Sequence, residues 1–286
     1  MTNKCLSLVI HGGAGAMAGH DYDAEIAHMR GLIEAGRDRL RAGAAAMDVV
    51  VETITALEAS GLYVAGRGAA PNSAGKYELD ASLMHGPTRA AGAVAALQGF
   101  ASPIQVARAV MDTTPHVMLA GDGAAAFAAA QGLEQIGPEW FTAARTSETL
   151  SPSTGTVGCL ALDEAGALAA GTSTGGTNGK LYGRVGDSPI VGAGVWADDR
   201  VAVSCTGVGE YFLRTATAVQ IAHRLQFAGQ GLADAAEAAL DDVVQLGGWG
   251  GLIALSATGE IAMPFRSQGM KRAALSPDGT ITSEVF

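Results

Sequence analysis

Charged side chains are scarce in this chain, and basic ones are the scarcer kind. Only 16% of the 286 residues are charged, with 18 basic against 28 acidic residues, which gives a formal net charge of −10 at pH 7. Proteins that bind nucleic acid carry a basic surface, so we expect no nucleic-acid partner. Because 48% of the residues are hydrophobic, we expect part of the surface to be buried in an oligomer.

Cysteines and long apolar runs are also few. The three cysteines, Cys5, Cys159 and Cys205, are odd in number, and two of them lie in apolar runs. This favours buried free thiols in a reducing compartment over a disulfide framework. No run approaches 18 apolar residues, and residues 1–11 hold no long apolar segment. We therefore expect no membrane span and no signal peptide, and a cytoplasmic location.

The chain lacks the Gly-x-Gly-x-x-Gly pattern of dinucleotide-binding proteins. A buried strand is predicted at 6–10, and His-Gly-Gly-Ala-Gly follows at 11–15, but the six-residue spacing is absent. A phosphate-binding loop is therefore only a weak alternative. The 40 glycines cluster between apolar runs, which predicts tight turns and close backbone contacts rather than disorder.

Residue patterning predicts an α+β chain. Apolar spacing and helix-start signals predict helices at 26–40, 47–57, 102–112, 122–131, 210–227 and 232–246. Strand-like runs lie at 6–10, 76–84, 91–97, 156–162, 168–174, 201–205, 251–255 and 260–263, and a short apolar strand is expected after His116. The polar run 145–154 predicts an exposed linker. This order favours mixed sheets covered by helices over a doubly wound parallel sheet.

Thr156 begins a strand-like run directly after that linker. From spacing alone, an ordinary strand start is the simpler interpretation. The residue gains a chemical role if the Gly155–Thr156 bond is cut, because Thr156 then carries a free α-amine with a pKa of roughly 7.7–8.0. That amine can act as general base for the neighbouring hydroxyl, so one residue would supply both nucleophile and base.

Four ordered motifs favour the chemical interpretation. They are His-Gly-Gly-Ala-Gly-Ala at 11–16, Thr-Ser-Thr-Gly-Gly at 172–176, Gly-Arg-Val-Gly-Asp-Ser-Pro at 183–189 and Ser-Cys-Thr-Gly-Val-Gly-Glu at 204–210. With them, essentially the whole chain resembles the plant-type asparaginase/isoaspartyl peptidase family of N-terminal-nucleophile hydrolases. The resemblance implies a four-layer α/β/β/α sandwich. It also implies self-cleavage of one folding unit, 1–286, into subunits 1–155 and 156–286.

The resemblance assigns catalytic roles to four residues. Thr156 would be the nucleophile, and Thr174 would hydrogen-bond its hydroxyl. Thr206 and Gly207 would form the oxyanion hole, through a hydroxyl and a backbone N–H. Without the resemblance, a hairpin threonine that bonds to local backbone is the favoured interpretation of Thr174.

Substrate-binding roles follow from the same resemblance. Arg184 would bind the α-carboxylate of the substrate, for which its planar fork is suited. Asp187 would accept hydrogen bonds from the α-ammonium, together with the carbonyl of Gly209. On the residues alone, a solvated loop ion pair is the commoner role for Arg184 and Asp187.

No cofactor is implied, but family members hold a structural sodium ion on backbone carbonyls, which suit a hard cation. The matching positions are Leu57, Glu58, Ser60, Tyr63, Ala65 and Arg67.

The chain departs from the family pattern near the expected site. Val64 stands where the family has an active-site asparagine, and Thr-Asn-Gly-Lys replaces the usual run at 177–180. Trp249 and Arg266 are also unusual. We hypothesise that these two residues contact the leaving group of a dipeptide, through a stacking face and a cation. For Arg266, a side chain turned to solvent is an equal alternative.

The leading functional hypothesis is a self-processed threonine hydrolase that cleaves β-aspartyl dipeptides and L-asparagine and releases L-aspartate. It would act as a dimer of processed heterodimers on a small-molecule substrate. Glycosylasparaginase is the second hypothesis. It is disfavoured because neither a secretory signal nor paired cysteines are expected. A third is an unprocessed, inactive relative that binds amino-acid-like ligands, which Val64 keeps open.

Overall fold

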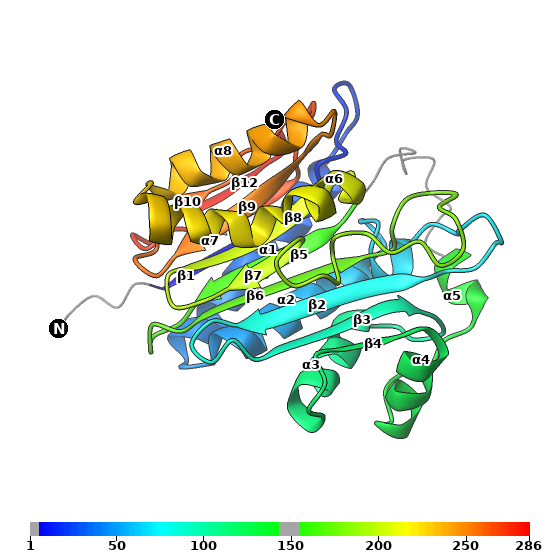
Figure 1. Ribbon diagram of the computed structural model, residues 1–286. Coiled ribbons are helices and arrows are strands. Elements are labelled where there is room, and N and C mark those ends of the chain that lie inside the picture. Colours follow the sequence, from blue (N-terminus) through cyan, green and yellow to red (C-terminus); the bar gives the residue numbers. More distant parts are fainter. Residues whose placement is uncertain (1–5, 143–154) are drawn as a thin grey trace.

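A computed structural model describes residues 6–142 and 155–286 of the chain (Figure 1). Its larger sheet has eight strands in the order β12-β11-β1-β5-β6-β2-β3-β4. The bounds are β1 (Ser7–His11), β2 (Leu79–His85), β3 (Ala91–Leu97), β4 (Met118–Ala120), β5 (Val157–Leu162), β6 (Leu168–Thr174), β11 (Arg272–Leu275) and β12 (Ile281–Glu284). Neighbouring strands are antiparallel except for β3 and β4.

The smaller sheet has the order β10-β9-β8-β7. Its strands are β7 (Val195–Ala197), β8 (Val201–Gly207), β9 (Gly250–Ser256) and β10 (Ile261–Ala262). Apolar side chains from both sheets, among them Val9, Leu160, Ala202 and Ile253, form one buried cluster. The two sheets therefore pack face to face, and β5 and β6 lie against β8.

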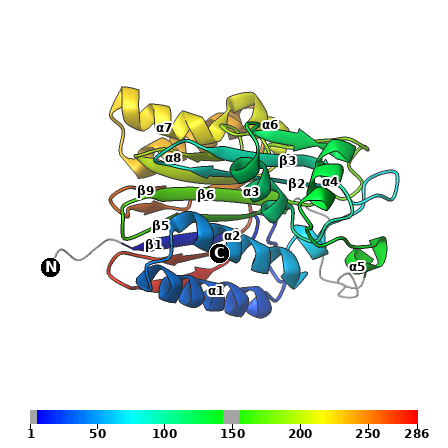
Figure 2. The same ribbon diagram turned by 90° about the horizontal axis from the view of Figure 1, so that it is seen from below.

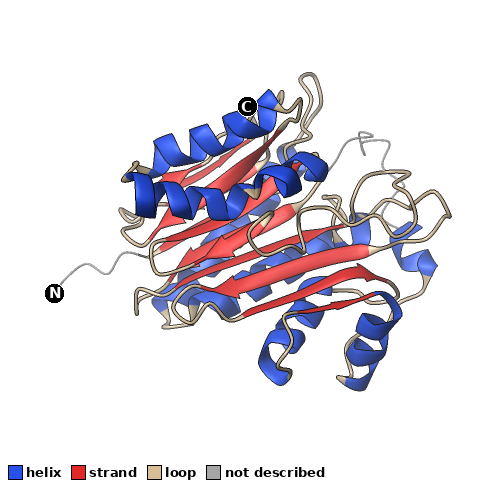
Figure 3. Ribbon diagram, viewed as in Figure 1, coloured by secondary structure: helices blue, strands red, loops and turns tan. Residues whose placement is uncertain are grey.

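Helices cover the outer faces of both sheets (Figures 2 and 3). On the larger sheet they are α1 (Asp23–Arg41), α2 (Ala46–Ser60), α3 (Pro103–Thr113) and α4 (Gly121–Ala130), and on the smaller sheet α6 (Gly209–Thr215), α7 (Thr217–Ala228) and α8 (Leu232–Gln245). Each set buries an apolar face in its own cluster, with Ile33 and Ile54 on one side and Ile221 and Leu240 on the other. Burial of such faces is the main stabilising term in a fold of this kind.

β5 lies inside the larger sheet, between β1 and β6. His11 of β1 pairs with Gly158, and Ser173 of β6 pairs with Val157. All six residues of β5 are buried, as its continuous apolar sequence predicts for a strand covered on both faces. Thr156 therefore lies directly before the first residue of a strand that is paired on both edges.

The α+β class and most of the predicted elements are confirmed. The helix expected at 210–227 is wrong in one respect: it is divided into α6 and α7. Ala216 separates the two helices with φ 49° and ψ 49°, a left-handed conformation that ends a helix. Five short elements were not predicted, namely β7, β11, β12, α5 (Pro138–Thr142) and the 3₁₀-helix η1 (Gly66–Gly68).

Two expectations about composition meet the structure directly. Cys159 and Cys205 are buried free thiols, whereas Cys5 lies outside the described residues. The expected linker 145–154 lies outside them as well. Over the described ranges, no helix is long and apolar enough to cross a membrane.

Candidate active site

A narrow pocket opens beside Thr156, with a free volume of about 10 Å³, room for about one water molecule. Five of the seven residues predicted for catalysis and substrate binding line it together. The lining residues are Gly155, Thr156, Thr174, Gly176, Thr177, Arg184, Gly186, Asp187, Ser188 and Gly207. Gly176, Thr177, Gly186 and Ser188 were not predicted, although each lies in or beside one of the four motifs.

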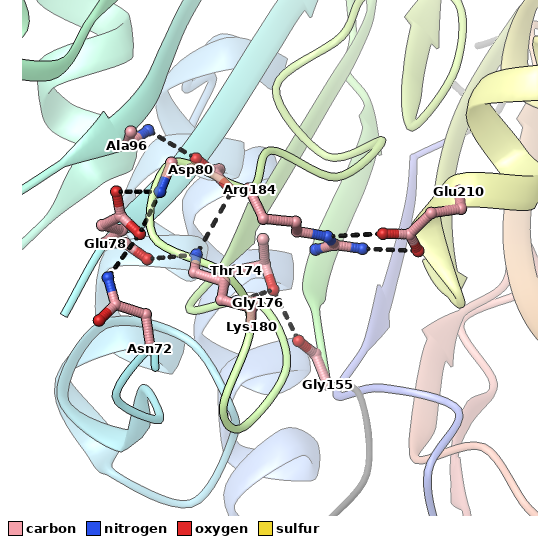
Figure 4. A network of polar contacts seen from close by, with 11 residues as sticks. Asn72, Glu78, Asp80, Ala96, Gly155, Thr174, Gly176, Lys180, Arg184 and Glu210 are labelled. Atoms are coloured by element: carbon pink, nitrogen blue, oxygen red, sulfur yellow. Dashed lines mark hydrogen bonds and ion pairs between the residues drawn. The ribbon is translucent and has the colours of Figure 1, made fainter. Parts of the chain in front are cut away.

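Thr174 faces the bond before Thr156. Its hydroxyl donates to the Gly155 carbonyl oxygen at 2.7 Å and accepts from the Gly176 N–H at 2.9 Å (Figure 4). The sequence predicted a bond from Thr174 to the Thr156 hydroxyl, and in the continuous chain the Gly155 carbonyl takes that place. A hydroxyl on this oxygen polarises the carbonyl carbon toward a nucleophile.

Val64 lies directly against Gly155. A Cβ placed on Gly155 would come within 2.7 Å of the Val64 Cβ, so the two residues touch. The Val64 carbonyl accepts from the Gly175 N–H at 2.8 Å, which fixes this stretch beside the end of β6. Val64 therefore contributes an aliphatic wall where the family asparagine would offer a donor and an acceptor.

The proposed oxyanion pair lies at the end of β8. The Thr206 hydroxyl oxygen accepts from the Ala14 N–H at 3.4 Å, which leaves the Thr206 hydroxyl hydrogen free to donate elsewhere. Gly207 allows a close approach of β9, because a Cβ there would lie 2.4 Å from the Trp249 carbonyl oxygen. A larger residue at 207 would force the two strands apart.

Arg184 is bound to a partner that the sequence did not predict. Its Nε and Nη2 donate to Glu210 Oε1 and Oε2 at 2.8 and 2.9 Å (Figure 4). Glu210 is the second residue of α6 and follows Gly209, which lies so close that a Cβ there would be 3.0 Å from Arg184 Nη2. A bidentate pair orients the guanidinium, and it leaves Nη1 available as a donor.

Asp187 is buried beside Arg184 with part of its carboxylate unpaired. Its Oδ2 atom has no hydrogen-bond partner among the residues that the structure describes. Burial raises the pKa of Asp187 to about 7, against the smaller effects of a backbone N–H bond and of the Arg184 charge. A buried carboxylate of this kind is stabilised by a cationic donor, and the α-ammonium of an amino acid is one.

A second polar group fixes the loop that carries Arg184 (Figure 4). Lys180 Nζ donates to the Glu78 carbonyl at 2.9 Å and lies 4.0 Å from Asp80 Oδ2. The Glu78 carboxylate accepts from Asn72 Nδ2 at 2.7 Å and from the Gly183 N–H at 3.0 Å. The unusual run 177–180 thus ends in a buried cation that anchors the loop.

Arg266 does not occupy the place hypothesised for it. Its Nη2 lies 2.6 Å from Glu237 Oε2 and 2.8 Å from Asp241 Oδ1, both on α8. Two carboxylates neutralise this cation, and neither Arg266 nor Trp249 lines the pocket beside Thr156. The geometry gives no support to a role for Arg266 in binding the leaving group.

The expected sodium-binding segment forms a tight turn between α2 and the short helix η1 (Gly66–Gly68). The carbonyls of Leu57, Tyr63 and Ala65 accept from Ser60 Oγ at 2.8 Å, the Ala65 N–H at 2.8 Å and the Gly68 N–H at 3.1 Å. Each of these carbonyls retains a second lone pair, which leaves it able to bind a cation. No cluster of metal-binding side chains occurs within residues 6–142 and 155–286, and sodium stays a prediction.

Glu58, in the same segment, has a separate structural role. Its buried carboxyl accepts from Ser173 Oγ at 2.6 Å, from the Ile104 N–H at 3.1 Å and from Ser102 Oγ. Burial raises the pKa of Glu58 to about 7, although these three bonds lower it. The carboxyl joins α2, the start of α3 and the strand that ends in Thr174.

Comparisons with known proteins agree with the four motifs. The profile of the family described as asparaginase matches residues 4–153 and 142–283. The isoaspartyl peptidase of Salmonella typhimurium is 44% identical over 298 residues, covering 95% of each chain, and that of Escherichia coli is 42% identical, covering 93% and 91%. The human isoaspartyl peptidase/L-asparaginase is 38% identical, covering 96% and 94%. The chain belongs to the asparaginase family.

Proposed function

We propose that this protein is an amide hydrolase that cleaves β-aspartyl dipeptides and L-asparagine and releases L-aspartate. The observation that carries the proposal is one pocket in which Thr156, the Gly155 carbonyl with its Thr174 hydrogen bond, Arg184 and Asp187 come together. The relatives named isoaspartyl peptidase and L-asparaginase support the same activity. Among the described residues that line the pocket, Arg184 and Asp187 are the charged ones, and together they suit an amino-acid head group.

Maturation would begin in the continuous chain. The Thr156 hydroxyl attacks the Gly155 carbonyl carbon, and the Thr174 hydroxyl stabilises the charge on the carbonyl oxygen. The peptide bond breaks as an ester forms on the threonine oxygen, and the Thr156 nitrogen leaves as an amine that takes up the proton lost by the hydroxyl. Water then hydrolyses the ester, which gives a Gly155 carboxylate and restores the hydroxyl of an N-terminal Thr156. The amine that is created becomes the general base for the next reaction.

In the mature site, Arg184 would bind the substrate α-carboxylate while Asp187 and the Gly209 carbonyl receive the α-ammonium. Holding the head group there places the side-chain amide at Thr156. Thr206 and Gly207 donate to the oxygen of the tetrahedral intermediate, and each such donor typically contributes about 10²–10³ in rate. The aspartyl ester on Thr156 is then hydrolysed by water.

The same proposal covers the organisation of the protein. The chain would be one folding unit of the four-layer α/β/β/α type found in N-terminal-nucleophile hydrolases, and it is supported by two facing sheets with helices outside. After cleavage, two heterodimers would associate. A structural sodium on the 57–67 segment and a cytoplasmic location, consistent with two buried free thiols, complete the proposal.

The experiment is a denaturing gel of purified protein followed by activity assays. Two fragments are expected, the smaller beginning Thr-Val-Gly-Cys on N-terminal sequencing, while Thr156→Ala stays one chain and is inactive. β-Aspartyl dipeptides, asparagine and a glycosylasparagine are then compared. Preference for the glycosylasparagine would support glycosylasparaginase. A single uncut, inactive chain would support an amino-acid-binding relative, the hypothesis that Val64 keeps open.

A further inference from the structure

A chain of buried hydrogen bonds ends at the carbonyl of Thr156. His11, the last residue of β1, places Nδ1 at 3.0 Å from the Thr156 carbonyl oxygen and Nε2 at 2.8 Å from Ser204 Oγ. The Ser204 hydroxyl lies 2.8 Å from the Thr172 hydroxyl. The side chains of all three residues are fully buried. These hydrogen bonds thus connect the larger sheet, through His11 and Thr172, to the smaller sheet, through Ser204, next to the proposed nucleophile.

The direction of each hydrogen bond in this network follows from the Thr156 carbonyl at its end. A carbonyl oxygen can only accept, so Nδ1 of His11 carries the proton. Burial lowers the pKa of His11 to about 3, so the ring is neutral and Nε2 must accept from Ser204. Because the Ser204 hydrogen is used there, its oxygen can accept from Thr172, whose hydroxyl also lies 3.3 Å from the Gly194 carbonyl oxygen. The Thr156 carbonyl and the Ser204 hydroxyl therefore hold His11 in the one tautomer that donates to Thr156.

Gly158 leaves the space that this arrangement needs. A Cβ on Gly158 would lie 2.0 Å from Ser204 Oγ and 2.3 Å from His11 Nε2. Any side chain there would displace both groups, which accounts for a glycine inside β5, two residues after Thr156. The stretch that follows His11 serves the same site, since the Ala14 N–H binds the Thr206 hydroxyl oxygen.

We propose that His11 is a positioning residue, whose Nδ1–H fixes the Thr156 carbonyl and thereby aims the hydroxyl and the amine of Thr156. The proposal rests on the proposed function of Thr156. Thr156 lies one residue before β5, so the sheet pairing of β5 does not hold it. After the cut it also loses its covalent link to Gly155, and the bond from His11 then orients the new N-terminus.

Two amide substitutions separate the two ring nitrogens of His11. In His11→Asn the side-chain N–H₂ falls near Nδ1 and can still donate to Thr156, whereas in His11→Gln the amide falls near Nε2 and reaches only Ser204. Both place a neutral amide in the same buried site. We expect His11→Asn to cleave itself and turn over within about threefold of wild type. His11→Gln should be slower by at least tenfold in both reactions, with KM for asparagine unchanged.

Three quantities are measured for each variant: kcat, KM and the melting temperature. The value of kcat is normalised to the amount of N-terminal threonine, which sequencing determines. Equal losses in the two variants, losses that follow only the melting temperature, or a rise in KM would overturn the role of His11. Failure of wild-type protein to cut after Gly155 would instead count against the proposed function.

Ser204→Ala tests the proposal if the His11 variants do not fold. This change leaves the imidazole in place and removes the hydrogen bond to Nε2, so the ring is held on one side only and its bond to Thr156 is less well directed. We expect kcat to fall several-fold at constant KM, together with an imidazole nitrogen spectrum in which the Nε2 signal shifts because its hydrogen bond is lost. An unchanged kcat with a shifted Nε2 signal would refute the positioning role.

Discussion

Glu210 grips one edge of the Arg184 guanidinium, through Nε and Nη2, and leaves Nη1 unused by that pair. A guanidinium can bind one carboxylate on that edge and a second at its end, so Glu210 is placed to orient Arg184 rather than to compete with substrate. The pair is partly exposed, with 17% of the Arg184 side chain and 54% of the Glu210 side chain accessible, so its contribution is modest.

Replacing Glu210 with Gln should therefore weaken substrate binding and leave chemistry nearly intact. We expect KM for asparagine to rise about threefold to tenfold with kcat changed little, because the interaction orients a binding group. Steady-state kinetics of the fully cleaved variant provides the measurement. A fall in KM would show that Glu210 competes with the substrate carboxylate for Arg184.

Thr174→Val should slow self-cleavage. The valine keeps the shape of threonine but cannot donate to the Gly155 carbonyl, a bond of 2.7 Å. The loss of one such donor costs about 10²–10³ in rate in other enzymes, and the same range is expected for the appearance of the two fragments on a gel. Thr174→Ser retains the hydroxyl and is the matched control. Cleavage of the valine variant at the wild-type rate would assign the carbonyl to another donor.

The raised pKa of Asp187, about 7, predicts a pH dependence of substrate capture. The charged carboxylate is the form that accepts an ammonium, so kcat/KM should increase as pH rises through about 7. In the bound complex the substrate ammonium favours the charged form, so kcat should vary less over this range. Asp187→Asn should remove this step and lower kcat/KM at least tenfold. A step that persists in the Asn variant would belong to another group, such as the Thr156 amine.

Glu58 should make stability depend on pH in the same interval. Its folded-state pKa, about 7, lies above the ordinary 4.5, so folding favours the protonated form. The stabilisation is fully present below about pH 4.5 and is lost as pH rises to about 7, on the order of 3 kcal/mol in total. Glu58→Gln mimics the neutral acid and should lack this loss.

The comparison for Glu58 is the difference in unfolding free energy between wild type and Glu58→Gln, measured in urea at pH 5 and pH 8. This difference isolates Glu58 from other groups that titrate in the interval, including Asp187. A gap that is the same at both values would mean that the carboxyl is ionised in the folded protein throughout.

The sequence was most informative where a motif couples chemistry to strand ends. Thr156, Thr174 and Gly207 were expected together and do line one pocket, because strand ends in a layered sheet meet at a common edge. The partners of these residues were harder to foresee. Glu210 is the last residue of the motif at 204–210, but its pairing with Arg184 depends on how α6 starts, which residue spacing does not reveal.

Short elements escaped prediction for a related reason. β11 has four residues, two of them alanine, and β12 is mostly polar at the sheet edge, so neither shows a clear alternation. The partners of Arg266 were not predicted because they lie 25 and 29 residues earlier in the sequence, on α8. An unusual residue near a motif is not thereby near the site.

The strand order of the larger sheet has a consequence for a chain cut after Gly155. Read across β12-β11-β1-β5-β6-β2-β3-β4, the two fragments alternate, so that strands of one meet strands of the other at β11–β1, β1–β5 and β6–β2. The fragments can dissociate only if the sheet breaks at these three strand pairs. Once dissociated, they must associate again in a bimolecular step, which the uncut chain does not need. Maturation would thus turn a protein that can refold alone into one that is assembled once, and heat inactivation would become a one-way loss.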